Sequence, residues 1–285
     1  MKYTFIVAHE TQFVVNRMCH VLGVGCSGYY AWRKRAPSNR EEANQALVEL
    51  IKKEYEASRK TYGSPRLHVA LQRQGVVCGH NRVARLMRLH RIVAPTRRKY
   101  HPVTTQRDPE AVPAPNHLNQ DFTATAPNQK WVCDFTYIAT AEGWLYLAVV
   151  LDLFSRKVIG WAMSQTMDAA LVITALRMAL LGRRPAAGLL HHSDRGSQYT
   201  SAAYRNCLTE ALAQLSMSGA GNCYDNAVME SFFGTLKTEC VTGPFSTRSL
   251  ARTTIFEYLE VWYNRQRLHS TLGYHSPVDF EKLTL

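Results

Sequence analysis

The sequence predicts an α/β fold, in which a mixed five-stranded sheet with flanking helices follows all-α regions of helix-turn-helix type. Three observations support this prediction. Apolar residues recur at helical spacing between residues 9 and 93, a proline-rich stretch without periodicity follows, and β-branched and aromatic runs begin at Trp131. A chain of 285 residues is long enough for two domains, or for one domain with appendages.

Bulk composition argues against several classes of protein. No run of about 18 apolar residues occurs, so we expect no transmembrane helix. The N-terminal residues do not look like a signal peptide either. The seven cysteines are scattered and never form Cys-x-x-Cys, which argues against a disulfide framework and a structural zinc site. We therefore expect a cytoplasmic protein without a membrane partner.

The net charge of +12 is distributed unevenly along the chain. Residues 1–126 hold 20 basic and 9 acidic side chains, a net charge of +11. Residues 127–285 hold 14 basic and 13 acidic side chains, a net charge of +1. Such clustering favours an N-terminal part that binds nucleic acid, and a basic surface that serves only solubility is the alternative.

The helical part of the chain divides into two predicted units. Residues 1–38 form a helix-turn-helix-like segment, in which we expect Ser27 to cap the second helix. The glycines at 23, 25 and 28 spell the dinucleotide-binding pattern G-x-G-x-x-G. No predicted strand precedes this pattern and a Pro-Ser-Asn break soon follows it, so we favour a helix-turn-helix over a nucleotide site.

Residues 39–100 form the second unit, a basic helical domain that we expect to bind DNA. The side chains expected to contact DNA are Arg82, Arg85, Arg88, Arg97, Arg98 and Lys99. The first three lie in one row on a helix over residues 81–90, opposite an apolar face. Such a row suits the phosphates that line a DNA groove, and a merely solvated face is the alternative. Residues 101–126 then form a proline-rich linker.

Residues 127–285 are predicted to form an α/β core with a C-terminal helical extension. Strands and helices are expected there at residues 131–140, 144–153, 158–163, 167–181, 188–190, 200–212, 214–217 and from 226 onward. Their order, βββ-α-β-α-β-α, is the arrangement of the ribonuclease H fold.

Three carboxylates stand out in this core. Asp134 lies within the first strand, Asp194 follows 60 positions later at the end of a strand, and Glu230 follows after 36 more on the last helix. Carboxylate oxygens suit Mg²⁺ or Mn²⁺, and two such ions about 3.5–4 Å apart can drive phosphodiester cleavage. We expect these three side chains to be catalytic metal ligands. Lys237, two turns after Glu230 on the same helix face, is expected to hold a phosphate.

Other polar residues near the three carboxylates have simpler explanations. We expect Asp152 to pair with Arg156, and Asp225 to cap the helix that begins at Asn226. His191 and His192 are expected to pack within a strand or to support the metal ligands from outside, because no cysteine or histidine partner supports a zinc site.

These motifs resemble those of the integrase-core transposases of the IS-three insertion-sequence family. The similar stretches are residues 22–32, 62–66, 131–136, 192–199, 222–232 and 263–277. The resemblance implies a ribonuclease H fold, Mg²⁺ or Mn²⁺, and donor-strand cleavage followed by strand transfer. It also implies a homo-oligomer on DNA, acting on terminal repeats and target DNA near the nucleoid. The upstream-frame helix-turn-helix product is an expected partner, as a fusion or in a complex.

One departure from the family pattern keeps two alternatives open. Where the family has Ser-Arg-Lys-Gly, residues 218–221 read Ser-Gly-Ala-Gly, so two positive charges near the third carboxylate are absent. A metal-dependent ribonuclease H-like nuclease without strand transfer is one alternative. A DNA-binding regulator whose catalytic core has decayed is the other.

Overall fold

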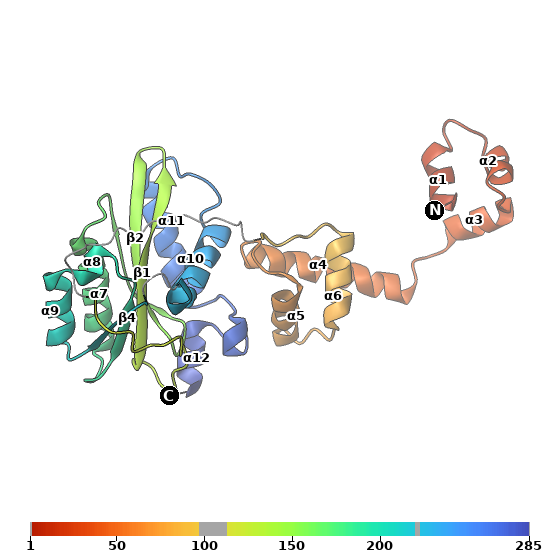
Figure 1. The fold of residues 1–285 in the computed structure, drawn as a ribbon. Helices are drawn as coiled ribbons and strands as arrows, with labels where there is room; N and C mark the ends of the chain where they lie inside the picture. The colour runs from red at the N-terminus through yellow and green to blue at the C-terminus, as the bar shows by residue number, and fades with distance from the viewer. Residues whose placement is uncertain (1, 97–112, 220–222, 285) are drawn as a thin grey trace.

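The computed structural model describes residues 2–96, 113–219 and 223–284. Along the chain these residues form a first helical unit, a second helical unit and an α/β core (Figure 1). The expected DNA-binding cluster of Arg97, Arg98 and Lys99 lies outside the described residues, as do two residues of the departure at 218–221.

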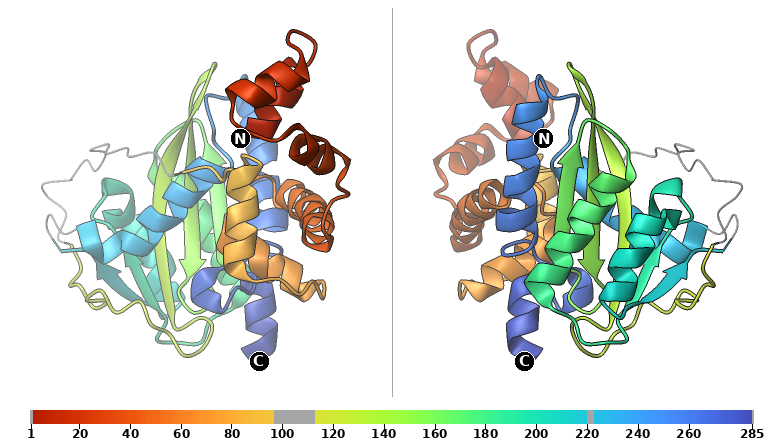
Figure 2. Two further views of the ribbon diagram at one scale, coloured as in Figure 1. Left: turned by 90° about the vertical axis from the view of Figure 1, so that its right-hand side faces the viewer. Right: turned by 90° about the vertical axis from the view of Figure 1, so that its left-hand side faces the viewer.

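The first helical unit consists of α1 (Lys2–His9), α2 (Val15–Val21) and α3 (Cys26–Lys34). Its small core is made by Ile6, Met18, Cys19 and Tyr29. Figure 1 shows these helices, next to the N-terminus, separated from the core by the second helical unit, whereas in the end-on views of Figure 2 they overlap other helices of the chain.

In the first helical unit, one helix was not predicted and one expected helix cap was wrong. The sequence pattern did not predict α1, because Phe5 and Val7 of this helix stay exposed and only Ile6 is buried. Ser27 does not cap a helix, because α3 begins one residue before it and the cap position is Gly25, without a side-chain bond. The glycine pattern follows α2 and runs into α3, with a helix rather than a strand before it, which agrees with a helix-turn-helix rather than a dinucleotide site.

The second helical unit consists of α4 (Asn39–Ala57), α5 (Ser64–Arg73) and α6 (His80–Leu89). Helix α4 begins with a capping box, in which Ser38 accepts a hydrogen bond from the Glu41 amide and the Glu41 side chain accepts one from the Ser38 amide. The apolar face of α6 is buried, as expected, and it belongs to the same hydrophobic cluster as Phe232 and Trp262 of the core. This unit therefore shares a hydrophobic interior with the core.

The sheet of the core contains β1 (Lys130–Thr140), β2 (Gly143–Asp152), β3 (Val158–Ser164), β4 (Leu190–Ser193) and β5 (Gln214–Met217). Its strand order is β3-β2-β1-β4-β5. The first three strands are antiparallel, while β4 is parallel to β1 and β5 is parallel to β4. This topology confirms the predicted mixed five-stranded sheet of ribonuclease H type.

Helices cover both faces of the sheet (Figure 1). One face carries α7 (Ala169–Arg183), α8 (Ser197–Thr200) and α9 (Ala202–Glu210). The other face, toward the second helical unit, carries α10 (Ala227–Glu239) and α11 (Arg248–Glu257). Helix α7 lies so close to β3 that a Cβ atom on Gly160 would come within 2.2 Å of the Ala175 carbonyl oxygen. Glycine is required at this crossing.

The C-terminal tail crosses back over β3. It contains the π-helical stretch η2 (Tyr258–Tyr263), the short η3 (Ser270–Leu272) and α12 (Pro277–Thr284). Asn264 accepts a hydrogen bond from the Val158 amide and donates one to the Val158 carbonyl, both 2.9 Å. At other positions of β3, the Trp161 amide donates to the Met178 sulfur and Arg252 donates to the Met163 carbonyl.

Residues 113–126, the second half of the expected linker, contain no helix or strand but lie against the core. Leu118 is buried, and the amides of His117 and Leu118 both donate to the Ser216 hydroxyl on β5. None of the described helices is both long and apolar enough to cross a bilayer.

Candidate active site and basic surface

The pairing of β1 with β4 explains why Asp134 and Asp194 meet. The two parallel strands pair at a constant offset of 60 residues, as Trp131 with His191 and Val132 with His192. Continued by two residues, the same offset places Asp194 beside Asp134. Since side chains alternate along a strand, both carboxylates lie on the face to which Val132 contributes, the face that α10 covers.

Asp134 lies near the other three residues predicted for the site. The pKa of its carboxyl group is well above the ordinary value because the group is buried, and because the negative charges of Asp194 and Glu230 disfavour its ionised form. The amide of Phe135 donates to it at 2.8 Å and Lys237 lies near enough to act on it, and both oppose this rise. Asp134, Asp194, Glu230 and Lys237 are therefore one electrostatic group.

Asp194 is held by a tight turn after β4. Its Oδ1 accepts a hydrogen bond of 2.9 Å from the Gly196 amide. A Cβ atom at residue 196 would lie only 3.0 Å from Asp194 Oδ1 and from Gln198 Oε1. Glycine thus allows the backbone to approach the carboxylate and fix its orientation.

Glu230 and Lys237 both come from α10, whose buried face packs on the sheet through Met229, Phe232, Phe233 and Leu236. Glu230 itself is exposed. Phe233, one helical turn after Glu230, is buried, since four apolar side chains anchor this helix.

Lys237 is half-buried, with its ammonium 4.9 Å from the centroid of the Tyr137 ring. Burial lowers the pKa of Lys237, and the charge of Asp134 opposes that change. The Tyr137 ring packs edge-on against Trp144. Tyr137 was not among the predicted site residues, because an aromatic residue in a strand gives no sign that a cation will lie over it.

The donor set suits a hard divalent cation in its chemistry, because all three carboxylates offer only oxygen. The like charges around Asp134 also favour a bound cation, which would relieve their repulsion. Within the described ranges, no group of three or more His, Cys, Asp or Glu side chains is arranged closely enough to hold an ion as it stands.

Two expected roles for neighbouring acids were wrong. Asp152 pairs with Arg183 at 3.3 Å rather than with Arg156, because Arg183 at the end of α7 reaches over the buried end of β2. Asp225 does not cap α10. It accepts hydrogen bonds from the side chains of Asn116 and Gln120 and from the Gly219 amide, and so ties the chain before α10 to the core.

His191 and His192 are buried in β4, as expected for strand packing. Burial lowers the pKa of His191 to about 3 and that of His192 to about 4, so both rings are neutral at pH 7. His191 meets the Tyr204 hydroxyl, and His192 meets the hydroxyls of Ser216 and Ser218.

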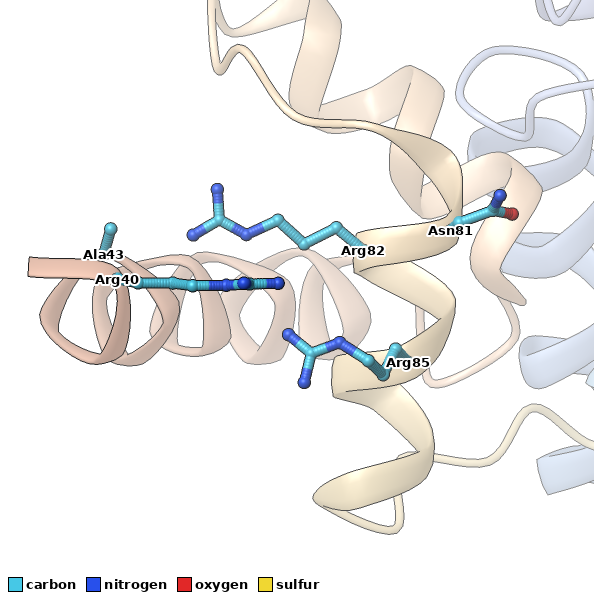
Figure 3. A pocket seen from close by; sticks show the side chains of 5 residues that line it. All are labelled: Arg40, Ala43, Asn81, Arg82 and Arg85. Atoms are coloured by element: carbon cyan, nitrogen blue, oxygen red, sulfur yellow. The ribbon is translucent and has the colours of Figure 1, made fainter. Parts of the chain in front are cut away.

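The second helical unit carries a basic hollow of about 490 Å³ between α4 and α6. In Figure 3 the side chains of Arg40, Arg82 and Arg85 extend into the same space between these helices. Arg82 donates to the Asn44 side chain at 2.9 Å, and none of the three arginines forms an ion pair within the described part of the chain. Arg88 is exposed on α6 but does not line this hollow. Arg40 was not predicted as a DNA contact, because it lies far along the sequence from the row of Arg82, Arg85 and Arg88.

Comparisons with known proteins agree with this architecture. Residues 124–223 and 230–285 match two families described as Integrase core domain, and residues 42–100 match one described as HTH-like domain. The chain is 47% identical over 266 residues to "Insertion element IS600 uncharacterized 31 kDa protein" of Shigella sonnei, covering 93% of this chain and 97% of that protein. It is 44% identical over 288 residues to "Transposase InsF for insertion sequence IS3A" of Escherichia coli (strain K12), covering 100% of both chains.

Two solved structures are similar at lower identity. A simian T-cell lymphotropic virus intasome in complex with PP2A regulatory subunit B56 gamma has a TM-score of 0.48 and 14% identity, with 81% of this chain and 74% of that chain covered. The HTLV-2 integrase catalytic core domain in complex with magnesium has a TM-score of 0.43 and 16% identity, with 56% and 99% covered.

Proposed function

Since the chain belongs to the insertion-sequence transposases with an integrase core, the family that its sequence resembles, we propose that it cleaves the ends of its own insertion element and joins them to target DNA. The proposal rests above all on one observation. Asp194, which follows β4, and Glu230 and Lys237, which both lie on α10, all act on the carboxyl group of Asp134 on β1.

In this proposal the three carboxylates act as one metal-binding group. Asp134 and Asp194 are fixed by short hydrogen bonds from nearby backbone amides, and Glu230 comes to them from α10. When bound, Mg²⁺ or Mn²⁺, as two ions, would activate the attacking oxygen and stabilise the leaving one. Lys237 lies beside Asp134 and offers a positive charge to a phosphate oxygen of the DNA.

The nucleophile in this proposal is water for cleavage and a DNA 3′-hydroxyl for strand transfer. Tyr199 is 1% exposed and Ser193 is fully buried, so neither can reach a phosphodiester from its present place. Tyr224 is exposed, and in this proposal it is not a nucleophile either. A trapped phosphotyrosine or phosphoserine adduct would contradict this part of the proposal.

DNA binding falls mainly to the residues before the core. Arg40, Arg82 and Arg85 form the basic hollow described above, and residues 1–126 carry a net charge of +11. Exposed guanidinium groups without carboxylate partners are suited to phosphates. Arg88 remains a proposed contact beside the hollow, as do Arg97, Arg98 and Lys99.

The test is cleavage of a duplex that carries the element's own terminal repeat, in Mg²⁺, by the full chain with and without its upstream-frame product. Added target DNA separates transposase from nuclease, because strand transfer yields joined products and simple hydrolysis does not. The chain is a DNA-binding regulator instead if it binds the duplex but never cleaves it, whether Mg²⁺ or Mn²⁺ is added and whether the upstream-frame product is present or absent.

A further inference from the structure

Residues 62–66 and 263–277, two of the stretches that resemble the family, have no part in the chemistry above. In the structure they contact each other. The Tyr62 hydroxyl accepts a hydrogen bond of 2.7 Å from the Leu268 amide. Arg66, on α5, donates through Nε to the Leu268 carbonyl at 2.9 Å. The second helical unit therefore holds both backbone groups of one residue of the C-terminal tail.

Arg267, the residue before Leu268, connects the contact of Tyr62 and Arg66 with Leu268 to α10. Arg267 donates three hydrogen bonds of 2.7–3.0 Å to both carboxylate oxygens of Glu239. The two side chains are only 4% and 6% exposed, and the Tyr258 hydroxyl donates to the same carboxylate at 3.0 Å. A bidentate guanidinium–carboxylate pair fixes the orientation of the two side chains as well as the distance between them.

Glu239 is the last residue of α10, the helix that carries the third carboxylate. Glu230 lies nine residues earlier on the same helix, about 14 Å along its axis. An α-helix of this length moves as a stiff rod, so a shift or rotation at Glu239 is carried to Glu230 and to Lys237.

We propose that Arg267 is a positioning residue, which links the second helical unit through Glu239 to the helix that presents Glu230. DNA bound on the second helical unit thereby sets the place of the third carboxylate beside Asp134 and Asp194. This inference rests on the proposed function, because it gives the second helical unit a part in the same reaction.

Other bonds across the same interface provide matched controls. Arg59 pairs with Glu257 at 2.6 Å, and Arg73 donates to the Tyr274 carbonyl at 3.0 Å. Both join the second helical unit to the C-terminal part of the core. Glu257 is next to Tyr258, which itself donates to Glu239, so Arg73, whose bond has no such neighbour, is the better control. If the interface only held two parts together, all these bonds would matter alike.

The experiment compares Tyr62→Phe with Arg73→Ala in the full chain. The phenylalanine keeps the ring near Trp262, where the two ring centroids are 5.6 Å apart, and removes only the hydroxyl. We expect its affinity for a terminal-repeat duplex to stay within about twofold of wild type, and its cleavage rate at saturating duplex to fall about tenfold. Arg73→Ala should match wild type in both measurements.

Hydrogen exchange of the amides at 227–239 gives a second readout that does not depend on cleavage. In the wild-type chain, duplex binding should slow exchange in α10, whereas in Tyr62→Phe the duplex should bind without slowing it. Arg267→Lys keeps the positive charge but loses the guanidinium group that binds both oxygens of Glu239, so it should behave like Tyr62→Phe. If Tyr62→Phe does not fold, Arg66→Gln serves in its place.

Wild-type cleavage by Tyr62→Phe and Arg267→Lys, with α10 still protected, overturns the inference. Equal losses in Arg73→Ala overturn it as well, because they mean that the interface acts only as a scaffold. A wild-type chain that never cleaves points to failure of the proposed function, and the hydrogen-exchange comparison still decides the link between duplex and α10.

Discussion

The two helical units at the start of the chain are built alike but relate to the core differently. The first has a small core of its own, made by four buried residues, and stands apart in the view of Figure 1. The second shares one hydrophobic cluster with the face of the sheet that carries α10. Their sequences, both helical and basic, do not reveal this difference.

The difference shows that a basic helical segment can be a separate appendage, like the first unit, or can share its hydrophobic interior with the α/β core, like the second. In the second unit, Leu67, Leu71 and Leu86 are almost fully buried in the cluster that it shares with the core. A fragment that begins near Pro127 would lose this packing. Comparing DNA binding of such a fragment with that of the full chain therefore also tests stability, and point variants are the cleaner probe.

The largest expected effect tests whether the chemistry belongs to the core alone. Asp134→Asn, Asp194→Asn and Glu230→Gln should each lower the cleavage rate by about a thousandfold or more. Combining two should add little further loss, because in our proposal the three residues act as a unit. Binding of the terminal-repeat duplex should persist, since we propose that the helical units make most of the DNA contacts. Two single variants with near-normal cleavage would show that the triad is wrong.

The next effect separates the two helical units by stability. Leu67→Ala should destabilise the whole body of core and second unit by about 2–5 kcal/mol, because Leu67 is fully buried in the shared cluster. Ile6→Ala is the matched control, equally buried but in the first unit. Denaturant unfolding followed by tryptophan fluorescence should show a shifted main transition for Leu67→Ala only. A similar shift for Ile6→Ala would mean that the first unit is also part of that body.

A third effect concerns the DNA contacts of the second unit. Replacing Arg40, Arg82 and Arg85 together by alanine should flatten the log–log salt dependence of duplex binding by up to about 3 units, since each phosphate contact contributes about 0.9. Arg177→Ala, an exposed arginine on α7 across the sheet, should leave the slope unchanged. An unchanged slope in the triple variant would mean that these arginines only solvate the surface.

The smallest effect is a pH dependence that only the core should show. Burial lowers the pKa values of His191 and His269 in the folded chain to about 3. Below the unfolded value of about 6.5, the unfolded chain therefore binds protons that the folded one does not. Each ring should then cost about 1.4 kcal/mol of stability per pH unit as the pH falls from 6.5 toward 3. The raised pKa of Asp134 works in the opposite direction.

The measurement is the free energy of unfolding at several pH values for the wild type and for His269→Phe. As the pH falls, this free energy should decrease less steeply in the variant, by about 1.4 kcal/mol per pH unit, because one proton fewer is bound on unfolding. The first unit provides a contrast, since neither His9 nor His20 is buried. An identical slope in the variant would show that His269 does not remain neutral in the folded chain.

Much of the fold could be predicted because apolar periodicity is strong in the core. The three antiparallel strands begin and end within a few residues of their predicted bounds, and the predicted β5 matches. The separation of Asp134 from Asp194 was also informative, because it equals the register offset of β1 and β4. The roles of these acids stay predictions until the variants above are measured.

What the sequence could not predict depends on contacts between distant residues. Arg156, only four positions from Asp152, has a positive φ of 58° and bonds to the Phe122 carbonyl, while the distant Arg183 takes the expected place. Arg40 joins Arg82 and Arg85 only because α4 packs beside α6. The joint of Tyr62 with Leu268 spans more than 200 positions, beyond any local pattern.

The outer edge of β3 has a consequence for how copies of this chain meet one another. An edge strand with open backbone groups is a template on which another chain can add a strand. In β3, Asn264, Met178 and Arg252 already bind the backbone groups of residues 158, 161 and 163. Side chains of the same chain thus take up backbone groups that a second copy would need, and two copies are discouraged from joining sheet to sheet at this edge.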